Sequence, residues 1–396
     1  MSFLIPAFNE EALIVETIQT YLSLNLNKKE IIVIDDGSHD KTLRLLKVMF
    51  QLRKSDVGEG NVYQSITYPE LVVLEASHLG KAQALNLGVR HASFDIICTM
   101  DADTVPVARG VEATLRAFAQ DKKLIACGGV IQVLESKMLK DNSPFGPGPQ
   151  GWLPSFQRTE YIRTFICERL GWSYLNSTLL ISGAFCMLKK SAVKRVGGFN
   201  HQSITEDFDL VVRLRKEFSG DMFRFRILPI TTCYTQVPAT LKHLCGQRMR
   251  WQSGLVQTLS DNLSMFFKPA HGLLGLFAVP YFWIVEVLSP VVEALVVMLV
   301  PWALYQGTLS VTQVAFFLGL GLAFNMLITM LGIHLDNNYV SQGNRASQLK
   351  GAVNTLLLNF GYKQLCSWWR LKALIKRLGR SSTWGEKSRT EIIHSI

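Results

Sequence analysis

Two patterns of apolar residues divide the chain near residue 260. Before that point, short runs rich in branched apolar residues alternate with segments of helical period, which is typical of βαβ units. This alternation predicts an α/β domain with a mostly parallel sheet over residues 1–260. The predicted strands are Phe3–Ile5, Glu30–Ile34, Leu71–Leu74, Ile96–Met100 and Leu124–Ile131, and helices are expected from Glu10, Asp40, Lys81 and Val107.

The second part of the chain is unusually apolar. Two apolar blocks, Leu273–Tyr305 and Val311–Ile333, lie in a stretch without Lys or Arg. The second block is long enough for one span of the ~30 Å hydrocarbon core, whereas the first is too long for one untilted span. Either Pro290 divides the first block into two membrane segments, or an interfacial piece leads into one span. Glu286 and Glu293 share a helix face there, which we expect to contact protein, a polar channel or the headgroup level.

A weaker apolar segment, Ala352–Trp369, fits a helix that lies in the membrane interface. The basic residues that follow place the end of the chain in the cytoplasm by the positive-inside rule. We therefore expect a membrane region over 261–369, with an interfacial helix and two to four transmembrane helices, and a basic cytoplasmic tail over 370–396. The tail cations are Arg370, Lys372, Lys376, Arg377, Arg380, Lys387 and Arg389.

Composition agrees with a membrane protein. Charged residues make up 18% of the 396 residues and apolar residues 48%, against roughly 25% charged in soluble proteins. These values exclude collagen-like, coiled-coil and disordered classes. The net charge of +10 suits anionic partners, and beside membrane segments anionic lipid is favoured over nucleic acid.

Polar clusters follow the predicted strands, at the edge where open parallel sheets bind ligands. The first strand is followed by Pro6–Glu10 and the second by Asp35–Asp40. A helix cap explains Ser38 or Asp40 in the second cluster. It does not explain the adjacent acids Asp35 and Asp36, which are placed to accept hydrogen bonds from a nucleoside base or ribose.

Lys81 begins a predicted helix, where a cation is poorly placed for the helix dipole unless an anion binds there. We interpret Lys81 as a phosphate or base contact rather than a solvated lysine. Asp101 and Asp103 follow the fourth strand and, being two residues apart, point the same way in an extended chain. Two such carboxylates need a cation, and oxygen ligands favour Mg²⁺ or Mn²⁺ shared with a substrate diphosphate.

Glu206 and Asp207 precede the helical run Phe208–Lys216 and are the candidate catalytic residues. They are either acids that complement the helix dipole or a general base at a helix N-terminus. The segment Ser182–Ala184 either brings backbone close to a substrate or serves tight packing. The Pro/Gly-rich stretch Asn142–Gly151 is either a hinge or a lid.

Gln247, Arg250 and Trp251 share one face of the expected helix Leu241–Thr258. Arg250 can bind phosphate with two hydrogen bonds, and Trp251 offers a flat face for a sugar ring. An amphipathic helix at the membrane interface explains the same residues, and both functions are compatible.

In this order, PAFNE, DDGSHD, GKAQALNLG, DAD, TED, QRMRW and the apolar blocks resemble the membrane-integrated family 2 glycosyltransferases, relatives of cellulose, chitin, hyaluronan and poly-N-acetylglucosamine synthases. The resemblance covers nearly the whole chain. It implies a GT-A fold with a Rossmann-like, mostly parallel sheet, a UDP-sugar donor, a divalent cation and inversion to a β-linkage. On the donor side, the resemblance implies that Asp35 or Asp36 and Lys81 contact uridine and its phosphates, that Asp101 contacts the diphosphate and that Asp103 binds the metal. It implies that Gln247 and Arg250 hold the pyrophosphate. Trp251 is the implied contact of the acceptor sugar, and Asp207 is the implied base.

We therefore expect an inverting transferase that extends a β-linked polysaccharide at the plasma membrane, most like the poly-N-acetylglucosamine type, with its catalytic domain in the cytoplasm. The alternative is transfer of a single sugar to a lipid acceptor. The expected partners are the UDP-sugar, the acceptor, membrane lipid and an accessory membrane subunit, with no nucleic acid.

The resemblance has one departure at the amino terminus. Members of the family usually have one or two membrane helices before the catalytic domain, whereas Met1 directly precedes the first predicted strand here. Either this branch lacks those helices, or the start is internal to a longer reading frame.

Overall fold

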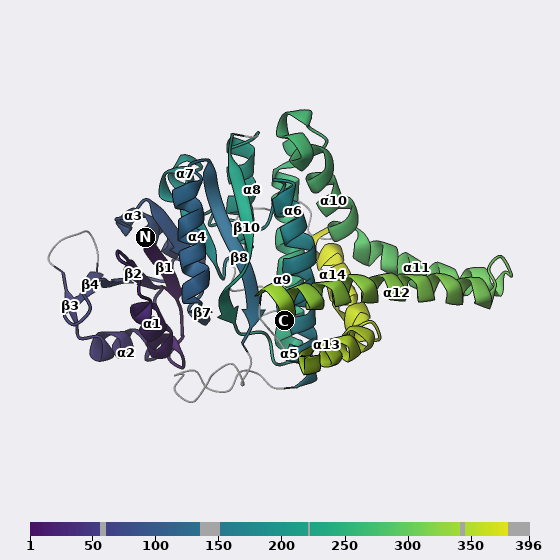
Figure 1. Ribbon diagram of the computed structural model, residues 1–396, viewed down its shortest axis with the longest axis horizontal. Coiled ribbons are helices and arrows are strands. Elements are labelled where there is room, and N and C mark those ends of the chain that lie inside the picture. Colours follow the sequence, from purple (N-terminus) through teal and green to yellow (C-terminus); the bar gives the residue numbers. More distant parts are fainter. Residues whose placement is uncertain (56–60, 135–150, 221, 341–344, 379–396) are drawn as a thin grey trace. The chain divides into compact units, whose positions relative to one another are not determined.

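The computed structural model describes residues 1–55, 61–134, 151–220, 222–340 and 345–378 (Figure 1). The chain forms two compact units. The first contains residues 1–150 and 169–237, and the second contains residues 151–168 and 238–396. Residues 142–150 of the predicted hinge or lid, and the tail cations Arg380, Lys387 and Arg389, lie outside the described residues.

One sheet forms the centre of the first unit. Its strand order is β3-β4-β5-β2-β1-β6-β9-β8-β10-β7. All ten residues of β8 are buried, as expected of a strand that is covered on both faces. The strands are β1 Ser2–Ala7, β2 Glu30–Asp35, β3 Leu52–Lys54, β4 Asn61–Ser65, β5 Leu71–Glu75, β6 Ile96–Thr99, β7 Thr104–Pro106, β8 Leu124–Val133, β9 Cys186–Lys189 and β10 Arg224–Thr235.

The sheet is mixed, so the prediction of a mostly parallel sheet is wrong. Parallel pairing joins β5, β2, β1 and β6 in a row and also joins β8 to β10. Strand β9 runs antiparallel between β6 and β8, and β3, β4 and β7 also pair antiparallel. These added strands have three to five residues each, which is too short for a clear period in the sequence.

Helices connect and cover these strands. Helix α3 packs on β1 and β2, and α4 packs on β8 and β10 (Figure 1). The buried residues of α3 include Ala82, Leu85 and Val89, whose spacing forms one apolar stripe. The helices of this unit are α1 Ile14–Ser23, α2 Thr42–Met49, α3 Lys81–His91, α4 Ala108–Gln120, α6 Leu170–Tyr174, α7 Lys190–Arg195 and α8 Glu206–Glu217.

The carboxyl ends of the parallel strands meet at one edge of the sheet. Ala7 at the end of β1 pairs with Asp35 at the end of β2, and Asp35 pairs with Glu75 at the end of β5. The motifs PAFNE and DDGSHD begin in the last residues of β1 and β2 and continue into the loops that follow, and the loop after β5 leads to Lys81. The register therefore gathers motifs that are far apart in the sequence.

The second unit is helical. Its core contains Leu153 and Phe156 of α5, Leu244 of α9, and Tyr362 and Cys366 of α14, together with Leu358 of α13. Its helices are α5 Trp152–Ile162, η2 Arg163–Arg169 (whose last residue begins the second segment of the first unit), α9 Leu241–Asp261, η3 Leu263–Met265, η4 Pro269–His271, η5 Leu274–Ala278, α10 Val279–Tyr281, η6 Phe282–Val287, α11 Ser289–Tyr305, α12 Val311–Leu335, η7 Asp336–Val340, α13 Arg345–Leu358 and α14 Tyr362–Leu378.

One helix among the described residues, Val311–Asn338, is long and apolar enough to cross a membrane, with a mean hydropathy of 2.1. A second candidate is the pair Leu274–Val287 and Ser289–Tyr305, which is bent by 43° at its break. The two to four spans expected from the sequence therefore stay a prediction. Of the alternatives for Glu286, contact with protein is observed, because its carboxylate lies 3.3 Å from the guanidinium of Arg370.

The segment Ala352–Trp369 does not form one helix. It is divided between α13 and α14, and Gly361 between them has a positive φ of 88°, which favours glycine. Its location in a membrane interface stays a prediction.

Gly110 tests the packing of α4 on β10. A Cβ at this position would lie 2.3 Å from the carbonyl oxygen of Thr231 and 2.6 Å from Cα of Thr232. We expect Gly110→Ala to lower the free energy of unfolding by about 1–3 kcal/mol, since the backbone itself must move. Gly171→Ala in α6 is the control, because a Cβ there meets nothing within 4 Å. Thermal unfolding that ranks Gly110→Ala as the more stable variant would contradict this packing.

Candidate active site

Two buried acids lie at the end of β2 and have different surroundings. The carboxylate of Asp36 accepts the backbone N–H groups of Leu79 at 2.5 Å and Gly80 at 2.8 Å. Asp35 accepts the N–H of Ser38 at 3.3 Å through Oδ2, but its buried Oδ1 has no hydrogen-bond partner among the described residues. Asp36 therefore shapes the loop before α3, whereas one oxygen of Asp35 is left without a partner there.

An aromatic cluster lies beside these acids. The ring of Phe8 is 4.6 Å from that of His78 and 5.9 Å from that of His39, measured between centroids. Phe8 is 38% exposed, so part of this apolar ring is accessible from outside the protein. Phe8 is not among the site residues predicted from the sequence, although an aromatic residue inside a strand-end motif is a visible signal.

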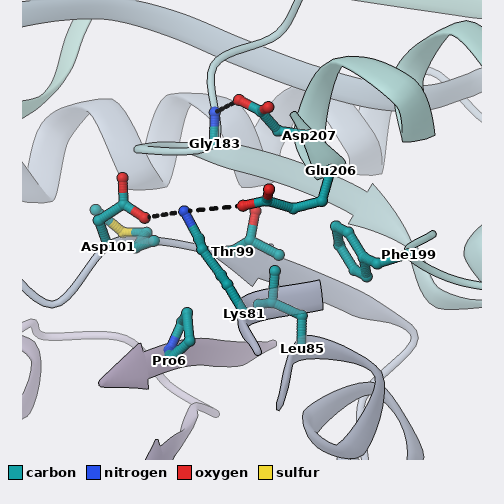
Figure 2. A pocket seen from close by; sticks show the side chains of 10 residues that line it. Pro6, Lys81, Leu85, Thr99, Asp101, Gly183, Phe199, Glu206 and Asp207 are labelled. Atoms are coloured by element: carbon teal, nitrogen blue, oxygen red, sulfur yellow. Dashed lines mark hydrogen bonds and ion pairs between the residues drawn. The ribbon is translucent and has the colours of Figure 1, made fainter. Parts of the chain in front are cut away.

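Lys81, the first residue of α3, connects acids from two other elements. Its Nζ lies 2.5 Å from Oδ1 of Asp101 and 3.2 Å from Oε1 of Glu206 (Figure 2). Burial alone would lower the pKa of Lys81, but the carboxylates of Asp101, Glu206 and Asp207 outweigh burial and raise the pKa above its usual range. Lys81 is therefore a permanent cation in a cluster of acids.

Asp207 is held by the backbone on both of its oxygens. Oδ2 accepts the N–H of Gly183 at 2.8 Å (Figure 2). Oδ1 accepts the N–H of Phe208 at 2.8 Å. Burial, followed by the nearby Glu206 carboxylate, raises the pKa of Asp207. A raised pKa makes this carboxylate a stronger base than an ordinary aspartate.

Gly183 lets Asp207 take this position. A Cβ on Gly183 would lie 2.9 Å from Oδ2 of Asp207, closer than such contacts allow. Of the two alternatives for Ser182–Ala184, close packing is therefore observed, and what the segment packs against is the candidate base.

Asp103 after β6 and Glu10 after β1 are carboxylates whose charged forms are disfavoured by burial and by neighbouring carboxylates. Burial and the Asp101 carboxylate raise the pKa of Asp103 to about 6. Burial, followed by the carboxylates of Asp103, Asp101 and Asp40, raises the pKa of Glu10 to about 7. Such repulsion falls when a cation binds.

These acids do not form a complete metal cage. In the part of the chain that the structure describes, no three His, Cys, Asp or Glu residues are arranged to hold a metal ion. Mg²⁺ usually binds through one or two carboxylates plus the phosphates of a substrate. Asp101 and Asp103 therefore fit a cation that is shared with a diphosphate.

One small pocket brings several of these groups together (Figure 2). It joins the cation Lys81 to the candidate base Asp207, which lie 126 residues apart in sequence (207 − 81). Asp35, Asp36 and Asp103 do not line it. The lining residues are Pro6, Lys81, Leu85, Thr99, Met100, Asp101, Gly183, Phe199, Glu206 and Asp207.

The QRMRW residues belong to the second unit, on α9. Trp251 is 37% exposed, and the guanidinium of Arg248 lies 4.9 Å from the centre of its ring. Arg250 is exposed. Oε1 of Gln247 is buried without a hydrogen-bond partner among the described residues.

Comparisons with known proteins agree with this geometry. Residues 2–197 match the family described as "Glycosyl transferase family 2". The chain is 31% identical over 254 residues to a poly-beta-1,6-N-acetyl-D-glucosamine synthase of Staphylococcus aureus (strain COL), a match that covers 64% of this chain and 54% of that protein. A synthase of the same name from Staphylococcus epidermidis is 30% identical over 256 residues, with the same coverage. The chain thus spans about half the length of the curated relatives it matches.

A solved structure shares the fold. The mannosyltransferase PcManGT from Pyrobaculum calidifontis, in complex with GDP-Man and Mn2+, aligns with a TM-score of 0.58 and 16% identity over 96% of this chain and 87% of that one. This similarity supports a GT-A-like mixed α/β fold. Residues 2–197 of this chain are therefore a glycosyl transferase family 2 domain.

Proposed function

We propose that the protein transfers a sugar from a UDP-sugar to a growing β-linked polysaccharide at the plasma membrane, with inversion, and that the sugar is N-acetylglucosamine. One observation carries the proposal: the same pocket holds the cation Lys81 and the backbone-held carboxylate of Asp207. Such a pocket suits a donor whose leaving group is a diphosphate and an acceptor that must lose a proton.

The donor contacts follow from the surroundings of each residue. The unpartnered oxygen of Asp35 is suited to a nucleoside hydrogen bond, and the exposed ring of Phe8 to the face of its base. Lys81 is suited to the phosphates. The names of the curated relatives support N-acetylglucosamine as the sugar.

The reaction is a single displacement. Asp207 removes the proton of an acceptor hydroxyl, whose oxygen attacks the anomeric carbon from the side opposite UDP. The bond from that carbon to the diphosphate oxygen breaks, and its electron pair leaves with UDP. Lys81 offsets the growing negative charge. Mg²⁺ or Mn²⁺, held by Asp101 and Asp103, would neutralise more of that charge.

The remaining residues have supporting roles in the proposal. Glu206 pairs with Lys81 and so positions that cation, while Asp36 shapes the loop before it. Gln247 and Arg250 hold the pyrophosphate, and Trp251 stacks on the acceptor sugar.

The membrane part of the proposal rests on the second unit. Its apolar helices span the bilayer with the catalytic unit in the cytoplasm, where anionic lipid contacts the basic residues of α14. An accessory membrane subunit is a further proposed partner.

UDP release from purified membranes, with Mg²⁺ or Mn²⁺ and a panel of UDP-sugars, tests the proposal. We expect release with UDP-N-acetylglucosamine and a polymeric product by mass spectrometry. A single-sugar lipid product would favour transfer to a lipid acceptor instead. Folded protein that releases UDP from no donor would overturn the proposal.

Asp207→Asn tests the base. We expect turnover to fall by roughly 10²-fold or more, the scale of general-base contributions, while UDP affinity stays unchanged. Asp121→Asn is the control, because Asp121 pairs with Arg224 away from the pocket. Asp207→Asn with wild-type turnover would show that another group removes the proton.

The pH dependence of turnover follows from the same carboxylate. Only deprotonated Asp207 can accept a proton, and burial raises its pKa, so turnover should rise with pH through that raised value. The acid limb of kcat against pH should therefore have its midpoint above the ordinary aspartate value of about 3.9. A flat profile down to pH 4 would be inconsistent with this assignment.

Asp103→Asn tests the cation site. Loss of one carboxylate should raise the Mg²⁺ or Mn²⁺ concentration for half-maximal turnover by about 10-fold or more. Wild-type protein treated with a chelator should lose turnover and regain it when the metal returns. Full turnover in excess chelator would exclude the proposed cation.

A further inference from the structure

The loop after α7, residues 196–200, brings an aromatic ring into the pocket. Phe199 lines the pocket together with Lys81, Asp101 and Asp207, and only 4% of its surface is exposed. It is the largest apolar side chain among the lining residues. In the proposed reaction the anomeric carbon lies between the diphosphate and the base, so residues that line this pocket face the transferred sugar.

Asn86 holds the backbone of Phe199 at both of its polar groups. The N–H of Phe199 donates to Oδ1 of Asn86 at 2.8 Å, and Nδ2 of Asn86 donates to the carbonyl oxygen of Phe199 at 2.8 Å. Asn86 lies on α3, the helix that begins with Lys81. One helix therefore sets both the cation and the ring.

Arg213 of α8 provides a second anchor. Its guanidinium donates to the carbonyl oxygens of Val196 at 2.6 Å and Gly198 at 2.7 Å. The carboxylate of Asp209, itself buried, holds the same guanidinium at 2.7 Å. Helix α8 begins with Glu206 and Asp207, so the element that supplies the base also fixes this loop.

We propose that Phe199 is a specificity-determining residue that packs against the acetamido methyl of the donor sugar, and that Asn86 is the positioning residue that sets its place. The inference rests on the proposed function. Two helices fix the backbone of Phe199, so its ring cannot move freely out of the pocket. The ring therefore favours a donor sugar that offers an apolar group. A contact with one methyl or methylene group changes the ratio of kcat/KM between two substrates by about 10–200-fold.

The ring is tested with Phe199→Leu and two donors, UDP-N-acetylglucosamine and UDP-glucose. We expect the ratio of kcat/KM for the acetylated donor to that for UDP-glucose to fall by about 10-fold, while UDP affinity changes by less than about twofold. Phe218→Leu is the matched control, because Phe218 is also buried in the first unit and packs on Phe223 rather than in the pocket. We expect Phe218→Leu to keep the wild-type ratio.

Two neighbouring glycines test the positioning role. Gly197 and Gly198 have φ angles of 79° and 78°, so alanine causes similar backbone strain at both. A Cβ on Gly198 would lie 2.3 Å from Oδ1 of Asn86, whereas one on Gly197 meets nothing within 4 Å. We expect Gly198→Ala and Asn86→Ala to lower the donor ratio as Phe199→Leu does, and Gly197→Ala to keep it.

The outcomes separate this inference from the proposed function. Wild-type protein that turns over neither donor contradicts the function itself. Turnover with a donor ratio that is unchanged in Phe199→Leu, Gly198→Ala and Asn86→Ala overturns the inference and leaves the function standing. A loss of UDP affinity equal to the loss of turnover in these variants would also overturn the inference. The ring would then contribute to nucleotide binding or to the stability of the fold rather than to the choice of sugar.

Discussion

The charge pairing of Lys81 with Asp101 and Glu206 is the interaction on which the site depends. These residues come from the start of α3, the loop after β6 and the start of α8, so one cation joins three elements. Removing Lys81 would leave the carboxylate of Glu206, whose side chain is only 6% exposed, without its cation. The pairing also gives Lys81 carboxylate partners that a bound diphosphate can replace.

Close backbone contacts make this arrangement possible. Asp207 takes its place because Gly183 has no Cβ, and the loop before Lys81 closes because its N–H groups bind Asp36. The two helices that supply Lys81 and Asp207 also hold the loop of Phe199 through Asn86 and Arg213. The cation, the base and the proposed sugar contact are therefore fixed by shared elements rather than by independent loops.

Much of this could be predicted from the sequence, because the signals were local. The parallel strands β1, β2 and β6 each lead into a polar motif, and the crossover rule brings those ends to one edge. The different surroundings of Asp35 and Asp36 could not be predicted, since the N–H groups that Asp36 binds are 43 and 44 residues away. The contact between Asn86 and Phe199 spans 113 residues, and strand β9 is too short to show a period. Sequence patterns predict elements well and long-range pairing poorly.

The affinities of UDP and uridine for wild-type protein and for Lys81→Met test the central claim most directly. Lys81 is proposed to bind the diphosphate and not the nucleoside, so wild-type protein should prefer UDP to uridine. In a Lys81→Met variant that thermal unfolding shows to be folded, that preference should fall by about 10-fold or more, because a hydrogen bond to a charged group contributes about that much to affinity. The affinity for uridine should be retained. A Lys81→Met variant that keeps the wild-type preference for UDP would contradict the account.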